Sequence, residues 1–157
     1  MSNYNVAEQP LEYAIYKSKA ALRMRLVNPR INNSSGRDVL NKGFVFLEMA
    51  PIKEGSGNQK QYEWEQKKIG VKLGMPDLAQ IVYSMKRGQE AEMFHEFDGS
   101  TKVIKLTRAT EGKSPYFISV SQNNGGVKSQ CSIPVSGHEA EVILNLVSYA
   151  IPKILNW

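Results

Sequence analysis

The sequence predicts an α+β fold in which four antiparallel strands and a helix occur twice within one domain. Short stretches of alternating apolar and polar residues recur along the chain, as expected of half-buried strands. Turn residues separate these stretches. Two segments with apolar residues at spacings of three and four follow the two groups of strands, which is typical of amphipathic helices. The 157 residues are enough for a single domain, 1–157, with its own core.

Composition and charge narrow the class of protein. The formal net charge of +5 is compatible with a polyanionic partner. No apolar run approaches the roughly 20 residues that cross a bilayer, so we expect no membrane insertion. The single cysteine, Cys131, leaves no internal disulfide. Residues 1–10 lack a signal core and read as a mobile N-terminal arm of a cytoplasmic protein.

The first strand is expected over residues 14–27, where basic residues occupy odd positions and apolar residues even ones. This period of two predicts one long strand with a basic face and an apolar face. The basic side chains are Lys17, Lys19, Arg23 and Arg25. Asn28-Pro29 and the polar residues 32–36 predict a loop after it.

Three more strands and a helix complete the first half. Residues 43–50 are almost continuously apolar, which favours a strand covered on both faces. After a turn at residues 54–58, the alternating residues 61–66 and 67–73 predict two further strands. Pro76 then marks a first helical position, and Gly88 is expected to close this helix.

The second half repeats the pattern with clearer turn signals. Strands are predicted over residues 91–97, 102–109, 116–122 and 127–133, separated by turns at residues 98–99, 111–113 and 123–126. A final helix is expected from Ser136 toward Trp157, with Glu139 completing a capping box and Pro152 distorting its end. This helix is apolar around much of its circumference, so either self-association or burial within one core can cover it.

Several short motifs occur in a fixed order along residues 13–157. Residues 16–22 read Tyr-Lys-Ser-Lys-Ala-Ala-Leu, and residues 150–157 read Ala-Ile-Pro-Lys-Ile-Leu-Asn-Trp. Further matching stretches are residues 42–48, 50–51, 61–64 and 94–96. The chain thereby resembles the Whirly family of single-stranded-DNA-binding proteins, with Ser18 and Asn156 standing where the family motifs have glycine.

The resemblance implies two antiparallel four-stranded sheets packed across each other, two helices and a homotetramer with the helices at its centre. It also implies that extended single-stranded DNA binds between sheets of neighbouring subunits with little sequence preference. The helix residues assigned to the subunit interface are Leu144, Val147, Ile151 and Leu155. Lys19 is expected to support higher assembly of tetramers. The absence of a targeting segment and an acidic tail favours a bacterial or phage member, although a shortened chain would look the same.

Single strands are held by cations along the phosphates and by aromatic platforms that stack bases. Candidates in the first half are Tyr16, Lys17, Lys19, Arg23, Arg25, Tyr62, Trp64, Lys68 and Lys72. Secondary candidates in the second half are Phe97, Lys105, Arg108 and Tyr116. For the lysines and arginines the alternative is a solvated face, and for Tyr62 and Trp64 it is the core.

An enzyme would have to build its site from two histidines and one cysteine. His95-Glu96 lacks the second histidine of a zinc-protease helix, and no partner is spaced to activate Cys131. We therefore expect a non-enzymatic protein without metal or cofactor. The family resemblance implies that it binds single-stranded DNA in replication, recombination or repair. The alternatives are an RNA-binding protein of the same fold, because stacking and phosphate contacts do not exclude RNA, and a transcription regulator that acts through protein partners.

Overall fold

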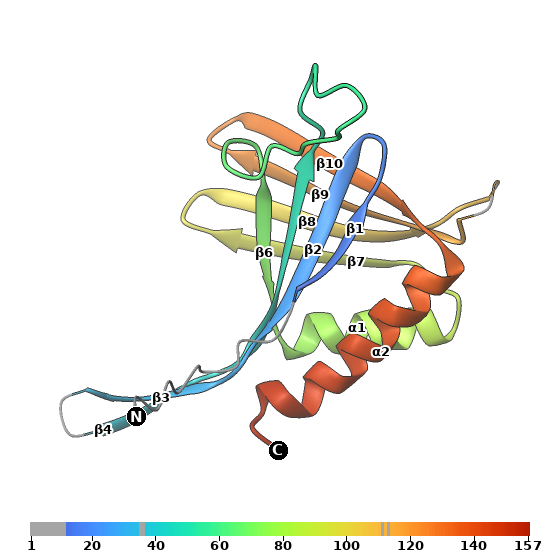
Figure 1. Cartoon of the computed structure of the whole chain (residues 1–157). Coiled ribbons are helices and arrows are strands. Elements are labelled where there is room, and N and C mark those ends of the chain that lie inside the picture. The colour runs from blue at the N-terminus through green and yellow to red at the C-terminus, as the bar shows by residue number, and fades with distance from the viewer. Residues whose placement is uncertain (1–11, 35–36, 111, 113) are drawn as a thin grey trace, which may run out of the picture.

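The computed structural model describes residues 12–34, 37–110, 112 and 114–157, so the predicted arm over residues 1–10 lies outside the described residues. Two four-stranded antiparallel sheets are each followed by a helix, which confirms the predicted fold class. The first sheet has the order β1-β2-β5-β6 and the second β10-β9-β8-β7. Figure 1 shows the strands of one sheet running across those of the other, with both helices at one end.

The bounds of the elements follow the chain. The first sheet and its helix comprise β1 (Tyr13–Tyr16), β2 (Ala20–Val27), β5 (Phe44–Pro51), β6 (Ile69–Leu73) and α1 (Met75–Lys86). The second comprises β7 (Ala91–Phe97), β8 (Ser100–Arg108), β9 (Tyr116–Asn124), β10 (Val127–Val135) and α2 (Gly137–Ile154). A separate hairpin of β3 (Arg30–Ser34) and β4 (Arg37–Asn41) joins β2 to β5.

The prediction of one strand over residues 14–27 is wrong, because the chain turns back on itself between Tyr16 and Ala20. The two halves pair as antiparallel strands, with Tyr16 opposite Ala21. The backbone N–H of Lys17 donates to the carbonyl of Ala20 at 3.0 Å across the turn. Lys17 and Lys19 therefore lie in a turn rather than on the strand face that carries Arg23 and Arg25.

Two other predictions in the first half are also wrong. Residues 61–66 form no strand, since Tyr62 makes only an isolated bridge with Ile52 and a turn follows. Of the predicted loop over residues 32–36, residues 32–34 belong to β3, which pairs with β4 from Arg30 with Asn41 to Ser34 with Arg37, and residues 35–36 lie outside the described residues. The predicted number of strands in the first sheet is right only because the split first strand offsets the missing one.

The second half agrees closely with the prediction because its turns carry strong local signals. Asp98 and Gly99 both have positive φ, 49° and 75°, in the turn between β7 and β8. Gly125 and Gly126 have φ of 59° and 92° in the turn between β9 and β10. Backbone of this kind suits Asp-Gly and Gly-Gly turns and fixes the register of both hairpins.

Capping hydrogen bonds stabilise the starts of both helices, although α1 begins at Met75, one residue before Pro76, and α2 ends at Ile154, before Trp157. The carboxylate of Asp77 accepts the N–H of Gly74 at 3.0 Å at the start of α1, and Gly88 with φ of 62° follows its end. At the start of α2, Ser136 Oγ accepts the N–H of Glu139 at 3.2 Å, and the Glu139 carboxylate accepts the N–H of Ser136 at 2.8 Å. Such caps satisfy backbone groups that the helix itself leaves unpaired.

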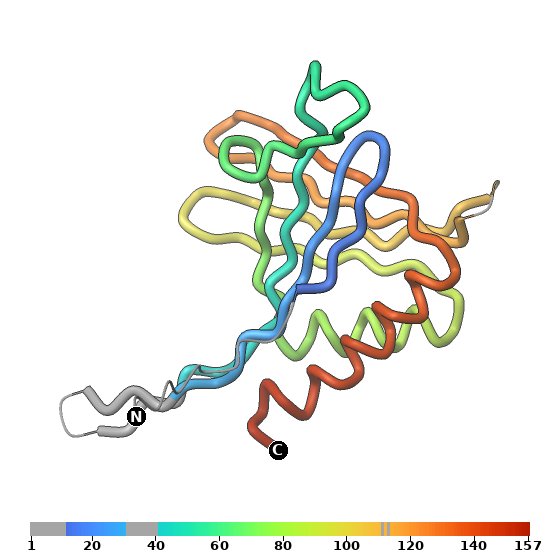
Figure 2. Tube along the Cα trace, viewed as in Figure 1, coloured from blue at the N-terminus to red at the C-terminus, as the bar shows by residue number. Residues whose placement is uncertain are grey.

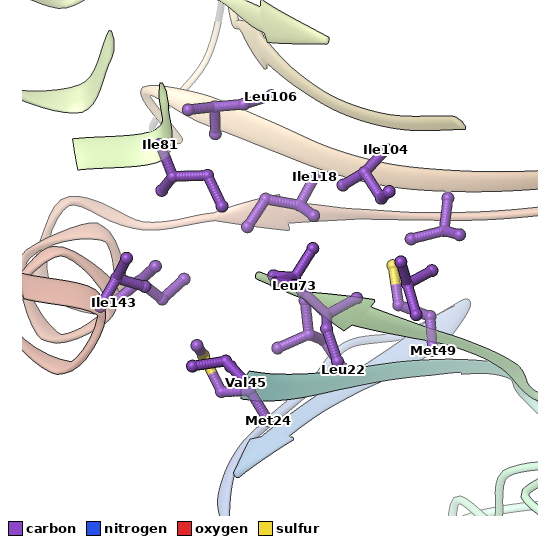
Figure 3. Packing of buried hydrophobic residues seen from close by; sticks show 14 of the residues in the cluster. Leu22, Met24, Val45, Met49, Leu73, Ile81, Ile104, Leu106, Ile118 and Ile143 are labelled. Carbon is purple, nitrogen blue, oxygen red and sulfur yellow. The ribbon is translucent and has the colours of Figure 1, made fainter. Parts of the chain in front are cut away.

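The core lies between the two sheets and under both helices. Figure 3 shows Leu22, Val45 and Leu73 of the first sheet facing Ile104 and Ile118 of the second. Ile81 of α1 and Ile143 of α2 close the same cluster. Burying each such side chain contributes about 1.5–3 kcal/mol, so the core fixes which strand faces remain outside.

The two departures from the motif glycines have different structural consequences. Among the described residues, Asp98 and Asn156 are the non-glycine residues with positive φ, so Ser18 does not require a glycine conformation. Asn156 has φ of 59°, the left-handed region that asparagine tolerates better than most residues.

Candidate nucleic-acid interface

An open cleft of about 650 Å³ lies where the β1–β2 turn meets the segment between β5 and β6, and it is lined by Tyr16, Lys60, Gln61, Tyr62 and Trp64. Figure 2 shows the turn and this segment at the same end of the molecule. The ring centroids of Tyr16 and Tyr62 are 5.6 Å apart, and those of Tyr62 and Trp64 are 6.4 Å apart. Three aromatic side chains thus gather at a solvent-open site.

Backbone hydrogen bonds hold the cleft segment in place. The N–H of Lys53 donates to the carbonyl of Gln61 at 2.7 Å, and that of Glu63 donates to the carbonyl of Pro51 at 2.9 Å. The Tyr62 hydroxyl donates to the carbonyl of Lys17 at 2.6 Å, which ties the segment to the β1–β2 turn. Burial and the neighbouring Tyr16 raise the pKa of Tyr62, so this hydroxyl remains a donor.

Cations lie over aromatic rings on the outer face of the first sheet. Arg25 of β2, Phe46 of β5 and Lys72 of β6 are neighbours in register. The Arg25 Cζ atom is 5.5 Å from the centre of the Phe46 ring, and Lys72 Nζ is 4.9 Å from that of Phe44. Both cations remain exposed. Rings beside cations are the combination that stacks bases and contacts phosphates.

A buried carboxylate holds two of the predicted cations. Glu48 is 5% exposed. Its carboxylate lies 2.6 Å from Arg23 Nε and 2.9 Å from Lys68 Nζ. Burial alone would raise the pKa of Glu48, but the bonds from Arg23 and Lys68 hold it below its usual value. The Arg23 Cζ atom also lies 4.1 Å from the centre of the Trp64 ring, so Trp64 rests on a cation.

The two lysines of the β1–β2 turn have different surroundings. Lys17 Nζ lies 2.8 Å from the carboxylate of Glu139 at the start of α2. Although burial raises it, bonds from Lys17 and Ser136 lower the pKa of Glu139 overall. Lys19 is exposed and makes no salt bridge within the part of the chain that the structure describes. Lys17 is therefore occupied by an internal partner, whereas Lys19 is available to an external anion.

The predicted residues of the second half do not join this site. Phe97 is 84% exposed and is the last residue of β7, next to the β7–β8 turn. Lys105 is exposed on β8 and lies 3.6 Å from Glu92. Arg108 lies at the opposite end of β8 from that turn. Tyr116 is 8% exposed within the core, so it has no surface to offer a base.

The residues of α2 and its C-terminal cap that were assigned to a subunit interface differ in burial. Val147 is fully buried in the core of its own subunit, which corrects its assignment to an interface. Leu144 and Ile151 are half-buried, and Leu155 is exposed. The exposed apolar stripe on α2 is instead formed by Val142, Leu146 and Tyr149. These three side chains border an apolar groove of about 350 Å³ together with residues of β1, β2 and β5.

Sequence reasoning missed Phe44, Phe46, Glu48 and Lys60. The available signal was that Phe44 and Phe46 alternate with Val45 and Leu47, which predicts two rings on the face opposite the core. The position of Glu48 had no local signal, because its partner Arg23 belongs to another strand. Lys60 lies next to the cleft only because its segment folds back onto β5.

Two other features are absent from the described residues. In that part of the chain, no group of three or more His, Cys, Asp or Glu side chains is arranged to hold a metal ion. Of the described helices, neither is both long enough and apolar enough to cross a lipid bilayer.

The chain is similar in sequence to one protein family and in structure to several solved proteins. Residues 15–146 match the sequence model of the family described as Whirly transcription factor. WHY1 from Arabidopsis thaliana has a similar structure, with a TM-score of 0.79, 25% identity, and coverage of 94% of this chain and 86% of that chain. The plant transcriptional regulator PBF-2 gives a TM-score of 0.77, 27% identity, and coverage of 94% and 91%.

A more distant structure shares the fold. The MRP1/MRP2 structure from Trypanosoma bruciei has a TM-score of 0.59 at 13% identity and covers 93% of this chain and 86% of that chain. At this identity the likeness extends to the fold alone. No curated protein sequence matches the chain.

Proposed function

Because the chain belongs to the Whirly transcription factor family, we propose that it binds single-stranded DNA with little sequence preference in replication, recombination or repair. One observation carries the proposal: Tyr16, Tyr62 and Trp64 line an open cleft beside a sheet face with exposed cations. We propose a non-enzymatic protein that acts in the cytoplasm.

The aromatic cleft favours a single strand over a duplex. Rings reach base faces only where the bases are unstacked, and each stack contributes roughly 1–3 kcal/mol. Such contacts are tolerant of sequence, because every base has a π-face. In this proposal Tyr16 and Trp64 stack bases, while Lys19, Arg25 and Lys72 follow the phosphates.

Self-association would cover the exposed apolar stripe of α2. Val142, Leu146 and Tyr149 are 38%, 40% and 60% exposed. An apolar stripe beside an apolar groove is the kind of surface that subunit interfaces bury. We propose a homotetramer that associates through this stripe, and light scattering of the purified protein measures its mass directly.

A titration of labelled oligothymidine against the same sequence as a duplex tests strand binding. The expected result is much tighter binding of the single strand, with an affinity that falls as salt rises because binding releases counterions. Equal affinity for the two forms would defeat the proposal. Competition with the matched RNA strand determines which nucleic acid is preferred.

A second candidate function is regulation of transcription, which is favoured by the family description and by the similarity to the regulator PBF-2. In that case strand binding would be incidental to a protein contact. Substitution of Lys19, Arg25 and Lys72 separates the two, because loss of strand binding with regulation intact would favour the second candidate.

A further inference from the structure

The outer face of the first sheet contains a buried acidic residue in the surface that we propose contacts a polyanion. Glu48 is 5% exposed and lies in register between Arg23 of β2 and Gly70 of β6. A carboxylate at this place repels phosphates and must also be desolvated. Its presence therefore requires an explanation within the site.

Stability of the fold does not supply that explanation. Removing a carboxylate from water costs free energy that its partners only partly offset, and apolar residues of similar size are often equally or more stabilising. Glu48 nevertheless accepts from Arg23 at 2.6 Å and lies 2.9 Å from Lys68 Nζ. What such a carboxylate supplies better than an apolar residue is the fixed orientation of its cations.

The orientation of Arg23 matters because of Trp64. The Arg23 guanidinium reaches from β2 and lies 4.1 Å from the centre of the Trp64 ring. Trp64 in turn lines the cleft with Tyr16 and Tyr62. Arg23 also lies 3.4 Å from the more exposed carboxylate of Glu12. Glu48 thus holds Arg23, and Arg23 supports the indole from the side of the sheet.

We propose that Glu48 is a positioning residue for strand binding, which acts through Arg23 to hold Trp64 as a stacking platform in the cleft. This inference rests on the proposed function and assigns a role to a residue that touches no nucleic acid. It also changes the role of Arg23, which becomes a support for the indole rather than a phosphate contact.

Whether Glu48→Gln raises or lowers the binding affinity distinguishes this positioning role from simple charge repulsion. If Glu48 were only a negative charge near the bound DNA, Glu48→Gln would strengthen DNA binding, because it removes repulsion of the phosphates. If Glu48 positions Arg23, the same substitution weakens binding, since the platform loses its support. The expected loss of affinity is roughly ten-fold, which corresponds to the loss of one base stack.

The experiment measures the binding of oligothymidine to the full chain and the quenching of Trp64 fluorescence. Trp157, the other tryptophan, is replaced by phenylalanine in every variant so that Trp64 alone reports. Glu92→Gln is the control, because it removes a carboxylate that is 62% exposed beside Lys105 on the outer face of the second sheet. This control is expected to bind as tightly as the parent or more tightly.

A second variant keeps the inference testable where Glu48→Gln does not fold. Arg23→Lys keeps the charge but loses the planar group that lies on the indole. A positioning role predicts weaker binding and less quenching of Trp64, with the slope of affinity against salt unchanged. A phosphate contact predicts unchanged affinity.

The outcomes are separable. Loss of affinity and of quenching in both variants supports the inference. Parental affinity and quenching in Arg23→Lys, or tighter binding in Glu48→Gln, overturns it while the proposed function stands. A parent protein that binds no oligothymidine at low salt overturns the proposed function itself.

Discussion

The outer faces of the two sheets share an antiparallel four-stranded backbone but differ in charge and in aromatic content. On the first sheet, one row across the strands runs from Arg25 through Phe46 to Lys72. On the second sheet, a row runs from Glu92 through Lys105 to Ser119 and Ser132. The first row combines cations with a ring, whereas the second pairs opposite charges among hydroxyl groups.

This difference indicates which face a polyanion would choose. Glu96, Thr101, Asn123 and Lys128 form another row of the second sheet, again with charges of both signs. A shallow groove of about 470 Å³ on this sheet is lined mostly by hydroxyl and amide side chains. Balanced charges attract a phosphate backbone weakly. Single-stranded DNA is therefore expected to bind on the first sheet and its adjoining cleft.

The largest difference in binding affinity is expected when one aromatic ring is removed next to the first sheet and, separately, one from the second sheet. Trp64→Ala should lower the affinity for oligothymidine by about 1–3 kcal/mol, because the cleft loses a stacking platform. Phe94→Ala removes a ring that is 62% exposed on the outer face of the second sheet and should leave affinity unchanged. Fluorescence anisotropy measures both. An equal loss in the two variants would break the comparison between the sheets.

The next largest difference is expected in the salt dependence of binding when exposed cations are removed from the outer face of either sheet. Replacing Arg25 and Lys72 by glutamine should reduce the slope of log affinity against log salt by about 0.7 for each lost phosphate contact. Replacing Lys105 and Lys128 by glutamine should leave that slope unchanged. Titrations at several salt concentrations provide the slopes, and a smaller slope for the second pair would assign phosphate contacts to the second sheet.

A finer comparison separates the two lysines of the β1–β2 turn. Lys19→Gln should reduce the salt slope by about 0.7, because its exposed ammonium is free to meet a phosphate. Lys17→Gln should leave the slope unchanged and lower the thermal midpoint, because Glu139 loses its partner. Matching slopes for the two variants would contradict the distinction between them.

The smallest effect is a change in the pH dependence of stability. The pKa of Glu139 is lower in the folded protein than its ordinary value of 4.5, so its stabilising contribution is present above that pH and is lost as pH falls below it. Glu139→Gln should therefore flatten the decline of the thermal midpoint in acid. Calorimetry between about pH 6 and pH 3 measures the effect, and parallel curves for variant and parent would refute it.

The accuracy of the sequence prediction differs between the two halves for a local reason. The hairpins of the second half turn at Asp98-Gly99 and Gly125-Gly126, whose positive φ values match their residue types. The β1–β2 turn contains only Lys17, Ser18 and Lys19 between its strands, so nothing in its composition marked it. Residues 61–66 alternate aromatic and polar side chains as a strand would. Their backbone makes only one isolated bridge, and the Trp64 ring packs on Arg23 of the first sheet.

The candidate site was predictable in its chemistry but not in its connections. The aromatic side chains of Tyr62 and Trp64 are the type that predicts a candidate stacking site. The pairing of Lys17 with Glu139 spans 122 positions, and that of Arg23 with Glu48 spans 25 positions between different strands. Such pairs depend on how the sheets and α2 are placed, which no local pattern encodes.

The left-handed backbone at Asn156 affects how such families are recognised. Its φ of 59° allows the N–H of Trp157 to donate to the carbonyl of Pro152 at 3.0 Å and so finishes α2. What the position requires is a conformation, and asparagine supplies it as glycine would, at a modest cost. A signature written as a string of letters would reject this chain at its penultimate residue, whereas one written in backbone angles would accept it.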